Sequence, residues 1–216
     1  ATTEYLSSQI SSWGTSQEWG VWIGRRAQAF TAANQQYVWL YANESTLNNT
    51  TVDGYRIAIG DDSGGDNIRL EYIVNGALSA TVINSSGTVA NGLTDVGFLV
   101  RVTRSSTGAW QIFTSALPTA NGAGAIATDT PNFESATISQ GSATHNTLVP
   151  ASNGYLGVAA LHSTAPDAVA TAEFDQFYFT SPIPTPTLGN YPTTPIALSG
   201  NTTVTPDAAP SNTTSI

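Results

Sequence analysis

The sequence contains no cysteine and no methionine. Disulfides, thiolate metal sites and cysteine nucleophiles are therefore excluded, and the side chains that oxidise most readily are missing. The sequence also lacks a continuous apolar stretch of about 20 residues, the length that a helix needs to cross a bilayer. We therefore expect a protein that tolerates an oxidising exterior and does not insert into a membrane.

Positive charge is scarce as well. The chain has 6 cationic residues, all of them arginine, against 15 acidic residues, which gives a formal net charge of −9. Proteins bind nucleic acid by neutralising several phosphates with Lys and Arg, so we expect no nucleic-acid partner. Charged residues make up 10% of the chain, where about 25% is usual, and uncharged polar residues must supply the solubility.

The sequence neither begins with methionine nor carries a charged-then-apolar signal segment. We expect it to be a processed or excised part of a secreted protein, located outside the cell or on the cell surface. Its 216 residues suit one domain followed by a tail.

Alternation of apolar and polar residues is the main pattern that is present, and it predicts β-strands. The stretches 55–60, 67–74 and 78–83 alternate in this way, and Asn75-Gly76 between the last two is a strong hairpin signal. Three consecutive antiparallel strands follow. The other predicted strands are 96–104 and 109–114, which form a second hairpin, and 5–10, 19–24, 36–42, 155–161 and 172–180.

About ten strands with short turns and without an amphipathic helix predict an all-β fold, a two-sheet antiparallel jelly-roll sandwich. Residues 115–152 are small and polar, and we expect a long loop there with one short strand at 135–139. Prolines become frequent after Ser181. We therefore expect a sandwich domain at 1–180 and an extended Pro/Thr-rich linker or docking tail at 181–216.

Three stretches carry a resemblance to a known family: "GYRIAIG…DNIRLEY", "VRVTRSSTGAWQIF" and "NGYLGVAA…AEFDQFYF". Their order resembles the laminin-G-like, concanavalin A-like jelly-roll domains of large secreted or cell-surface proteins of Bacteroidota-type bacteria. The likeness covers roughly residues 10–180. It implies a concanavalin A-like sandwich with an adhesive, glycan-binding or architectural role, and its relatives often bind calcium at a rim.

The loop "GDDSGGD" places Asp61, Asp62 and Asp66 within a few residues of one another. Calcium takes six to eight oxygen ligands, and a glycine-rich acidic loop can supply several of them. The resemblance strengthens this prediction of a calcium site. The alternative is a solvated turn without a metal.

Tyr37, Trp39 and Tyr41 alternate along one predicted strand and would share one of its faces. Flat rings with this spacing could stack on successive sugars, so we consider these three residues as ligand-binding. The alternative is that the rings belong to the core, because Val38 and Leu40 on the opposite face compete for the same burial.

Arg56, Arg69 and Arg101 all lie on the polar side of predicted strands, together with Glu71. A band of arginines could bind a carboxylated glycan, because the guanidinium presents a planar fork of donors. Cross-strand ion pairs with the acidic residues are the alternative that we favour.

Glu173 and Asp175 are the candidate catalytic pair, since jelly-roll glycosidases of the laminarinase type carry closely spaced acids on an inner strand. The third acid of that pattern is missing, and Phe177 and Phe179 continue the same face in a way that is typical of core. We expect no catalytic residue here.

The sequence thus predicts a non-catalytic extracellular surface or adhesion module that binds a glycan or a protein surface. One alternative is a structural subunit of an extracellular fibre, in which the tail 181–216 or the first strand adds to the sheet edge of another copy. A glycoside hydrolase is the third possibility.

Overall fold

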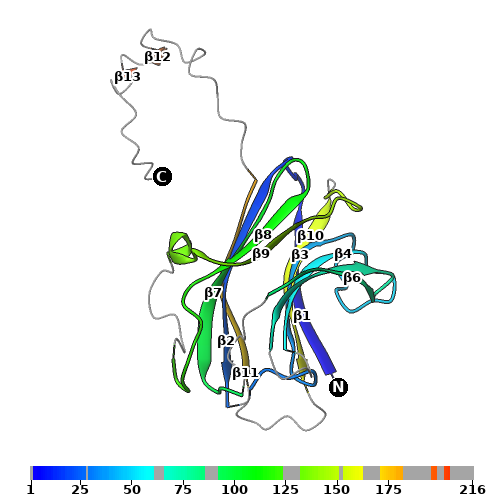
Figure 1. The fold of residues 1–216 in the computed structure, drawn as a ribbon. Helices are drawn as coiled ribbons and strands as arrows, with labels where there is room; N and C mark the ends of the chain where they lie inside the picture. The colour runs from blue at the N-terminus through cyan, green and yellow to red at the C-terminus, as the bar shows by residue number, and fades with distance from the viewer. Residues whose placement is uncertain are drawn as a thin grey trace. The chain divides into compact units, whose positions relative to one another are not determined.

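Two antiparallel sheets form the first part of the chain and lie face to face (Figure 1). The structure is a computed structural model. It describes residues 2–27, 29–60, 66–85, 92–123, 132–150, 153–162, 171–181, 196–198 and 202–204. The chain divides into the units Ala1–Pro182 and Ile183–Ile216. In the second unit, β12 (Ile196–Leu198) pairs with β13 (Thr202–Val204), and the role of this region as a linker or docking tail stays a prediction.

One sheet has six strands in the order β1-β10-β3-β4-β5-β6, and the other has five in the order β11-β2-β7-β8-β9. The strands of the first are β1 (Thr2–Ile10), β10 (Gly154–His162), β3 (Gln36–Ala42), β4 (Gly54–Ile59), β5 (Ile68–Val74) and β6 (Ala77–Asn84). Those of the second are β11 (Thr171–Thr180), β2 (Gln17–Arg26), β7 (Val96–Arg104), β8 (Ala109–Thr114) and β9 (Ile138–Thr144).

The predicted all-β sandwich is confirmed, and so is the run of three consecutive antiparallel strands, β4, β5 and β6. At the turn between β5 and β6, Asn75 and Gly76 have φ of 50° and 70°, the left-handed geometry that suits a two-residue hairpin. Among the described residues, no helix has the length and apolar character needed to cross a membrane.

The segment before β9 differs from the prediction. Instead of a strand at 135–139, Phe133–Ser135 form a single 3-10 turn, η1, capped by the side chain of Asn132, and β9 begins at Ile138. The sequence signal was weak because this region has few apolar residues, so the alternation that marks a strand is absent.

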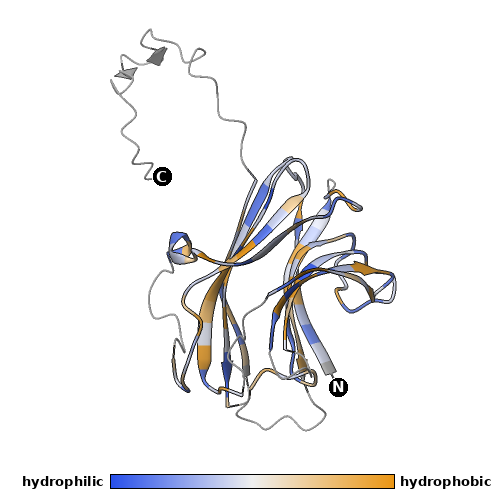
Figure 2. Cartoon of the chain, viewed as in Figure 1, coloured by the Kyte–Doolittle hydropathy of each residue, from blue (hydrophilic) through white to orange (hydrophobic). Residues whose placement is uncertain are grey.

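The main core lies between the sheets and is formed by apolar residues of both layers. Figure 2 colours the strands that supply them by hydropathy. Trp19 of β2 and Trp110 of β8 stack with their ring centroids 5.7 Å apart, and Tyr55 of β4 packs on Trp110 at 4.7 Å. Trp22 is also buried, but it belongs to a separate cluster of apolar residues. These three tryptophans are therefore all part of the buried interior.

Both sheets also bury apolar residues on their outward faces. Trp22 and Leu99 of the five-stranded sheet pack with Ala136, next to η1. On the six-stranded sheet, Leu47 and Val52 of the loop 43–53 lie over the rings of β3. Each outward face is thus partly covered by a segment that is not a strand.

His145, just after β9, contacts Tyr55 at one side of the aromatic core. The phenol oxygen of Tyr55 accepts from the backbone N–H of Leu148 at 3.3 Å and lies 2.7 Å from Nδ1 of His145. A neutral imidazole can accept the hydroxyl hydrogen of Tyr55 at Nδ1, whereas a protonated imidazole can only donate there. Burial lowers the pKa of His145 from its ordinary value of 6.5, and Arg104, which stacks near Trp110, is the nearby cation.

We predict that the chain loses stability as the pH falls below 6.5, the ordinary pKa of histidine. The folded state has the lower pKa, so the unfolded state takes up the proton first and gains from it. The stability that His145 contributes is fully present above the pKa of this residue in the unfolded state, and it is lost as the pH falls through its pKa in the folded state. Urea unfolding midpoints at several pH values should show this loss, and His145→Gln should reduce it. Retention of the full pH dependence in His145→Gln, or its loss in the control His162→Gln, would contradict the assignment.

Gly54 begins β4 at a close approach to β3. A Cβ at this position would lie 2.0 Å from the carbonyl oxygen of Tyr41, and a backbone atom cannot move aside as a side chain can. We predict that Gly54→Ala lowers the free energy of unfolding by about 1 to 3 kcal/mol, the usual cost of overpacking. Ser79→Ala, on the exposed part of β6, is the control and should change it by less than about 0.5 kcal/mol. Equal stability of the two variants in urea unfolding would refute this.

Candidate functional site

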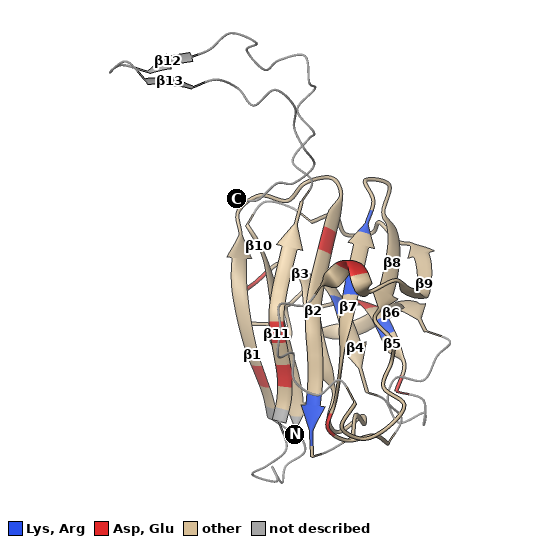
Figure 3. Ribbon diagram, turned by 90° about the vertical axis from the view of Figure 1, so that its left-hand side faces the viewer, with Lys and Arg blue, Asp and Glu red and all other residues tan. Residues whose placement is uncertain are grey.

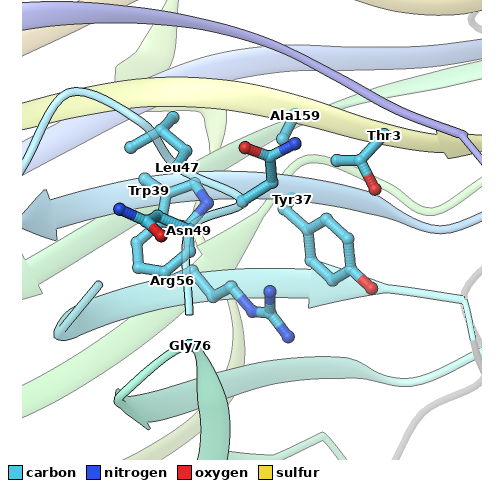
Figure 4. Close-up of a pocket in the computed structure, with 9 residues that line it drawn as sticks. Thr3, Tyr37, Trp39, Leu47, Asn49, Arg56, Gly76 and Ala159 are labelled. Atoms are coloured by element: carbon cyan, nitrogen blue, oxygen red, sulfur yellow. The ribbon is translucent and has the colours of Figure 1, made fainter. Parts of the chain in front are cut away.

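A pocket with a volume of about 190 Å³ lies on the outward face of the six-stranded sheet. Tyr37 and Trp39 of β3 and Arg56 of β4 lie side by side in it, and the loop 43–53 forms a wall next to Trp39 (Figure 4). The pocket brings together three of the six residues that the sequence predicted as ligand-binding. The other lining residues are Thr3, Leu47, Asn48, Asn49, Gly76 and Ala159.

The alternation of β3 places the two rings on this face. Val38 and Leu40 belong to the core between the sheets, so Tyr37 and Trp39 point the other way. Trp39 has only 1% of its surface exposed, which makes it the base of the pocket. Tyr37 has 8% exposed, and burial raises the pKa of its phenol.

The third ring of the predicted stripe, Tyr41, faces the opposite way. The register of β3 on β4 shifts between Trp39 and Tyr41, so Tyr41 pairs with Tyr55, a residue of the inner core. Its ring contacts Trp13 at 5.2 Å between centroids. The prediction that all three rings share one face is therefore wrong, because a β-bulge adds one residue and inverts the alternation.

Arg56 is held in a fixed position over Tyr37. Its guanidinium carbon lies 3.9 Å from the centroid of the Tyr37 ring and 5.5 Å from that of Trp39. Its Nε donates to Oε2 of Glu71 at 2.8 Å, across the β4–β5 pair in which the two residues are directly opposite. The phenol of Tyr37 contacts Oε1 of Gln35, so the ring beneath the guanidinium is itself fixed.

Glu71 pairs with two arginines. Its other oxygen, Oε1, accepts from Nε of Arg69 at 3.1 Å, and Nη2 of Arg69 donates to the carbonyl of Gly60 at 3.0 Å. The side chain of Glu71 is 4% exposed, whereas that of Arg56 is 19% exposed. The cross-strand ion pairing that we favoured is confirmed for Arg56, whereas Arg69 pairs with Glu71 along the same strand, β5.

Arg101 does not belong to this group. It lies on β7 in the other sheet, where its guanidinium carbon is 4.7 Å from the centroid of Phe113 and Nη1 is 3.3 Å from Glu18. A single band formed by Arg56, Arg69 and Arg101 is therefore wrong. The alternation of β7 gave the polar side of Arg101 correctly, but alternation cannot tell which sheet a strand joins.

The loop 43–53 is held by its own hydrogen bonds. Asn43 Oδ1 accepts from the backbone N–H of Asp53 at 2.8 Å, and Glu44 accepts from Asn49 Nδ2 at 2.8 Å and from Thr51 Oγ1 at 2.7 Å. Sequence reasoning missed Asn48 and Asn49, which line the pocket from this loop. The available signal was the cluster of polar turn-forming residues directly after a strand rich in aromatic residues.

Only Asp66 of the predicted calcium ligands lies among the described residues. It is buried, with 3% of its surface exposed, and has a positive φ of 39°; Asp61 and Asp62 fall outside the described residues. Within the described ranges, no three His, Cys, Asp or Glu side chains gather in a group that could hold a metal. Calcium binding by this loop stays a prediction.

Glu173 and Asp175 lie on β11, at an edge of the five-stranded sheet (Figure 3). The register shifts between Asp175 and Tyr178, and Gln176 has φ of 51°. This bulge turns the two acids outward, while Phe177 and Phe179 pack against the core. The prediction that all four share one face is wrong. Glu173 forms an ion pair with Arg26, and Asp175 is exposed.

Neither a protein-family model nor a curated protein matches the sequence. Solved structures do match the fold. The carbohydrate recognition domain of Emp47p is 10% identical, with a TM-score of 0.58, over 83% of this chain and 77% of that one. A legume lectin-like domain from Entamoeba histolytica is 10% identical, with a TM-score of 0.51, over 83% and 78%.

A third match is the exoplasmic/lumenal domain of VIP36 in its Ca²⁺/Man3GlcNAc-bound form. It is 10% identical, with a TM-score of 0.51, and the alignment covers 84% of each chain. Together these likenesses show the concanavalin A-like lectin fold, which is the architecture that the sequence resemblance implied. The narrower likeness to laminin-G-like domains stays a prediction.

Among the residues near the pocket, Glu71 should be the one whose substitution lowers the stability of the fold most, because its carboxylate is buried. We predict that Glu71→Gln lowers the free energy of unfolding by about 3 kcal/mol, because it leaves two partly buried guanidinium groups without this counter-charge. Glu4→Gln, at an exposed position of β1, is the matched control and should cost less than about 1 kcal/mol. Urea unfolding followed by tryptophan fluorescence gives both values, and similar costs for the two variants would contradict the role of Glu71.

Proposed function

We propose that the sandwich is a non-catalytic carbohydrate-binding module and that its ligand occupies the pocket formed by Tyr37, Trp39, Arg56 and the loop 43–53. The observation that carries the proposal is the pocket itself, which has polar groups around a fixed aromatic base. The solved structures with the same fold support it, because they include a carbohydrate recognition domain and a domain with bound Man3GlcNAc.

The polar groups of the pocket suit the hydroxyl groups of a sugar. Asn49 uses Nδ2 to hold Glu44, so its Oδ1 can accept from a ligand hydroxyl, and Asn48 is exposed at the pocket. Because Arg56 lies over Tyr37 and Trp39 is buried, the rings support the site from below. The ligand would be held mainly by hydrogen bonds, with the stacked guanidinium in place of an open aromatic platform.

The size of the pocket limits the ligand. Its volume of about 190 Å³ is below the roughly 300 to 1,000 Å³ of sites that enclose drug-sized molecules. One sugar unit, at the end or on a branch of a glycan, would occupy it, and the rest of the glycan would extend into solvent. Such a site binds weakly on its own, and several copies on a surface would raise the avidity.

The setting that we propose is extracellular, as a surface or adhesion module of a larger protein. A chain without cysteine or methionine and with few charges is compatible with that setting. We propose no catalytic role for Glu173 and Asp175, since one is paired with Arg26 and the other is exposed on an edge strand.

The test is a glycan array probed with the bacterially produced chain, with and without a calcium chelator. We expect binding to a limited set of glycans, and we expect Asn48→Ala to weaken it by about tenfold through the loss of one hydrogen-bonding group. Gln111→Ala is the control, because it removes an exposed amide from β8 in the other sheet. The chelator arm tests the calcium prediction separately.

Two results would overturn the proposal. One is the absence of binding to any glycan with or without calcium, which would favour the structural fibre subunit instead. The other is glycan binding that Asn48→Ala leaves unchanged and Gln111→Ala abolishes, which would place the ligand on the five-stranded sheet.

A further inference from the structure

We propose that the pocket selects a sugar that carries a carboxylate and that the terminal nitrogens of Arg56 hold this carboxylate. The inference rests on the carbohydrate-binding function proposed above and names the class of sugar. It follows from the way in which three neighbours fix the guanidinium of Arg56 while leaving one of its edges available.

Tyr37 and Glu71 determine how the guanidinium lies. The Tyr37 ring covers one face of the guanidinium, with its centroid 3.9 Å from the guanidinium carbon. Oε2 of Glu71 accepts a hydrogen bond from Nε at 2.8 Å. Within the described part of the chain, Nη1 and Nη2 of Arg56 have no hydrogen-bond partner. These two nitrogens form a planar fork whose spacing matches the two oxygens of a carboxylate. Because the fork is already oriented, binding would cost little side-chain entropy.

Glu71 does not satisfy Arg56 by itself. Its two oxygens are divided, with Oε2 on Arg56 and Oε1 on Arg69. Each arginine therefore binds one oxygen of Glu71. In a bidentate pair, one arginine would bind both oxygens of the carboxylate. A ligand carboxylate on the free edge of Arg56 would complete its hydrogen bonding in a site of low exposure, where charge-assisted hydrogen bonds are stronger than in water.

Glu44, an acid of the loop 43–53, does not block this site. Glu44 lies in the wall loop, where its two oxygens accept from Asn49 and Thr51, and it does not line the pocket. A ligand carboxylate at Arg56 would have the amides of Asn48 and Asn49 as its polar neighbours in that loop.

The charge of the chain favours one carboxylate over a highly charged group. Arg56 is the single cationic residue among the described residues that line the pocket, and the whole chain has a formal net charge of −9. A polysulfated or polyphosphorylated glycan would be repelled by that field, whereas one planar carboxylate meets one planar guanidinium. A uronic acid unit at the end of a glycan has this chemistry.

The test compares pairs of methyl glycosides that differ only at C6, as carboxylate or as hydroxymethyl: glucuronide with glucoside, galacturonide with galactoside and mannuronide with mannoside. Glucose 6-phosphate is added as a doubly charged probe. Binding is measured by titration of the indole and backbone amide resonances of the intact chain. We expect at least one acidic sugar to bind about tenfold or more tightly than its neutral partner, the usual effect of one charge-assisted hydrogen-bonded pair.

Arg56→Gln should remove this preference, so that the acidic and the neutral member of each pair bind with similar affinity, and the readout is the ratio within a pair because the variant also alters the pocket for neutral sugars. Arg101→Gln is the matched control, because Arg101 also stacks on an aromatic ring and pairs with a glutamate, but on the other sheet, and it should keep the preference. If Arg56→Gln does not fold, Arg56→Lys serves in its place. It keeps the charge but lacks the fork, and it should reduce the preference.

The outcomes separate this inference from the proposed function. Equal binding of acidic and neutral sugars, or a preference that persists in both Arg56 variants, would overturn the carboxylate assignment and leave carbohydrate binding intact. Tighter binding of the phosphorylated sugar than of every uronide would overturn it as well. A failure of all these sugars, together with a blank glycan array, would overturn the function and the inference together.

Discussion

The contact between Tyr55 of β4 and Trp110 of β8, with ring centroids 4.7 Å apart, joins one sheet of this protein to the other. The chain has no disulfide to link them, so apolar burial between the layers must hold the sandwich together. Trp19 extends the contact by stacking on Trp110. With the inner faces committed to this core, whatever the protein recognises must meet an outward face, an edge or a loop.

The strands were predictable because the alternation of apolar and polar residues indicates both an extended conformation and the face of the strand that is buried. β3, β7 and β8 occupy the predicted ranges, and the Asn75-Gly76 turn has the expected geometry. What alternation could not give is the position of a β-bulge, because one extra residue leaves the composition of a strand unchanged. At Leu40 and at Gln176 such a residue inverts the faces.

The candidate site shows the same limit. Tyr37, Trp39 and Arg56 were recognisable from their types and spacing, whereas the wall of the pocket was not. Asn48 and Asn49 reach it through a loop whose shape depends on Glu44, Asn43 and Asp53. One of the hydrogen bonds in this loop joins two side chains and another joins a side chain to a backbone N–H, each between residues well apart in the chain, and neither leaves a periodic trace in a sequence. The sequence could not predict to which sheet Arg101 belongs for a related reason. The order of strands in a sheet depends on pairing between segments that are far apart in the chain.

The wall of the pocket has a consequence for the choice of expression host. Asn48 is followed by Asn49 and Thr50, which makes it an acceptor for N-linked glycosylation in a eukaryotic secretory pathway. Asn48 is exposed and lines the pocket, so an oligosaccharide attached there would stand at the mouth of the site. The same polypeptide made by two cell types would then present either an open pocket or one shielded by its own covalent sugar.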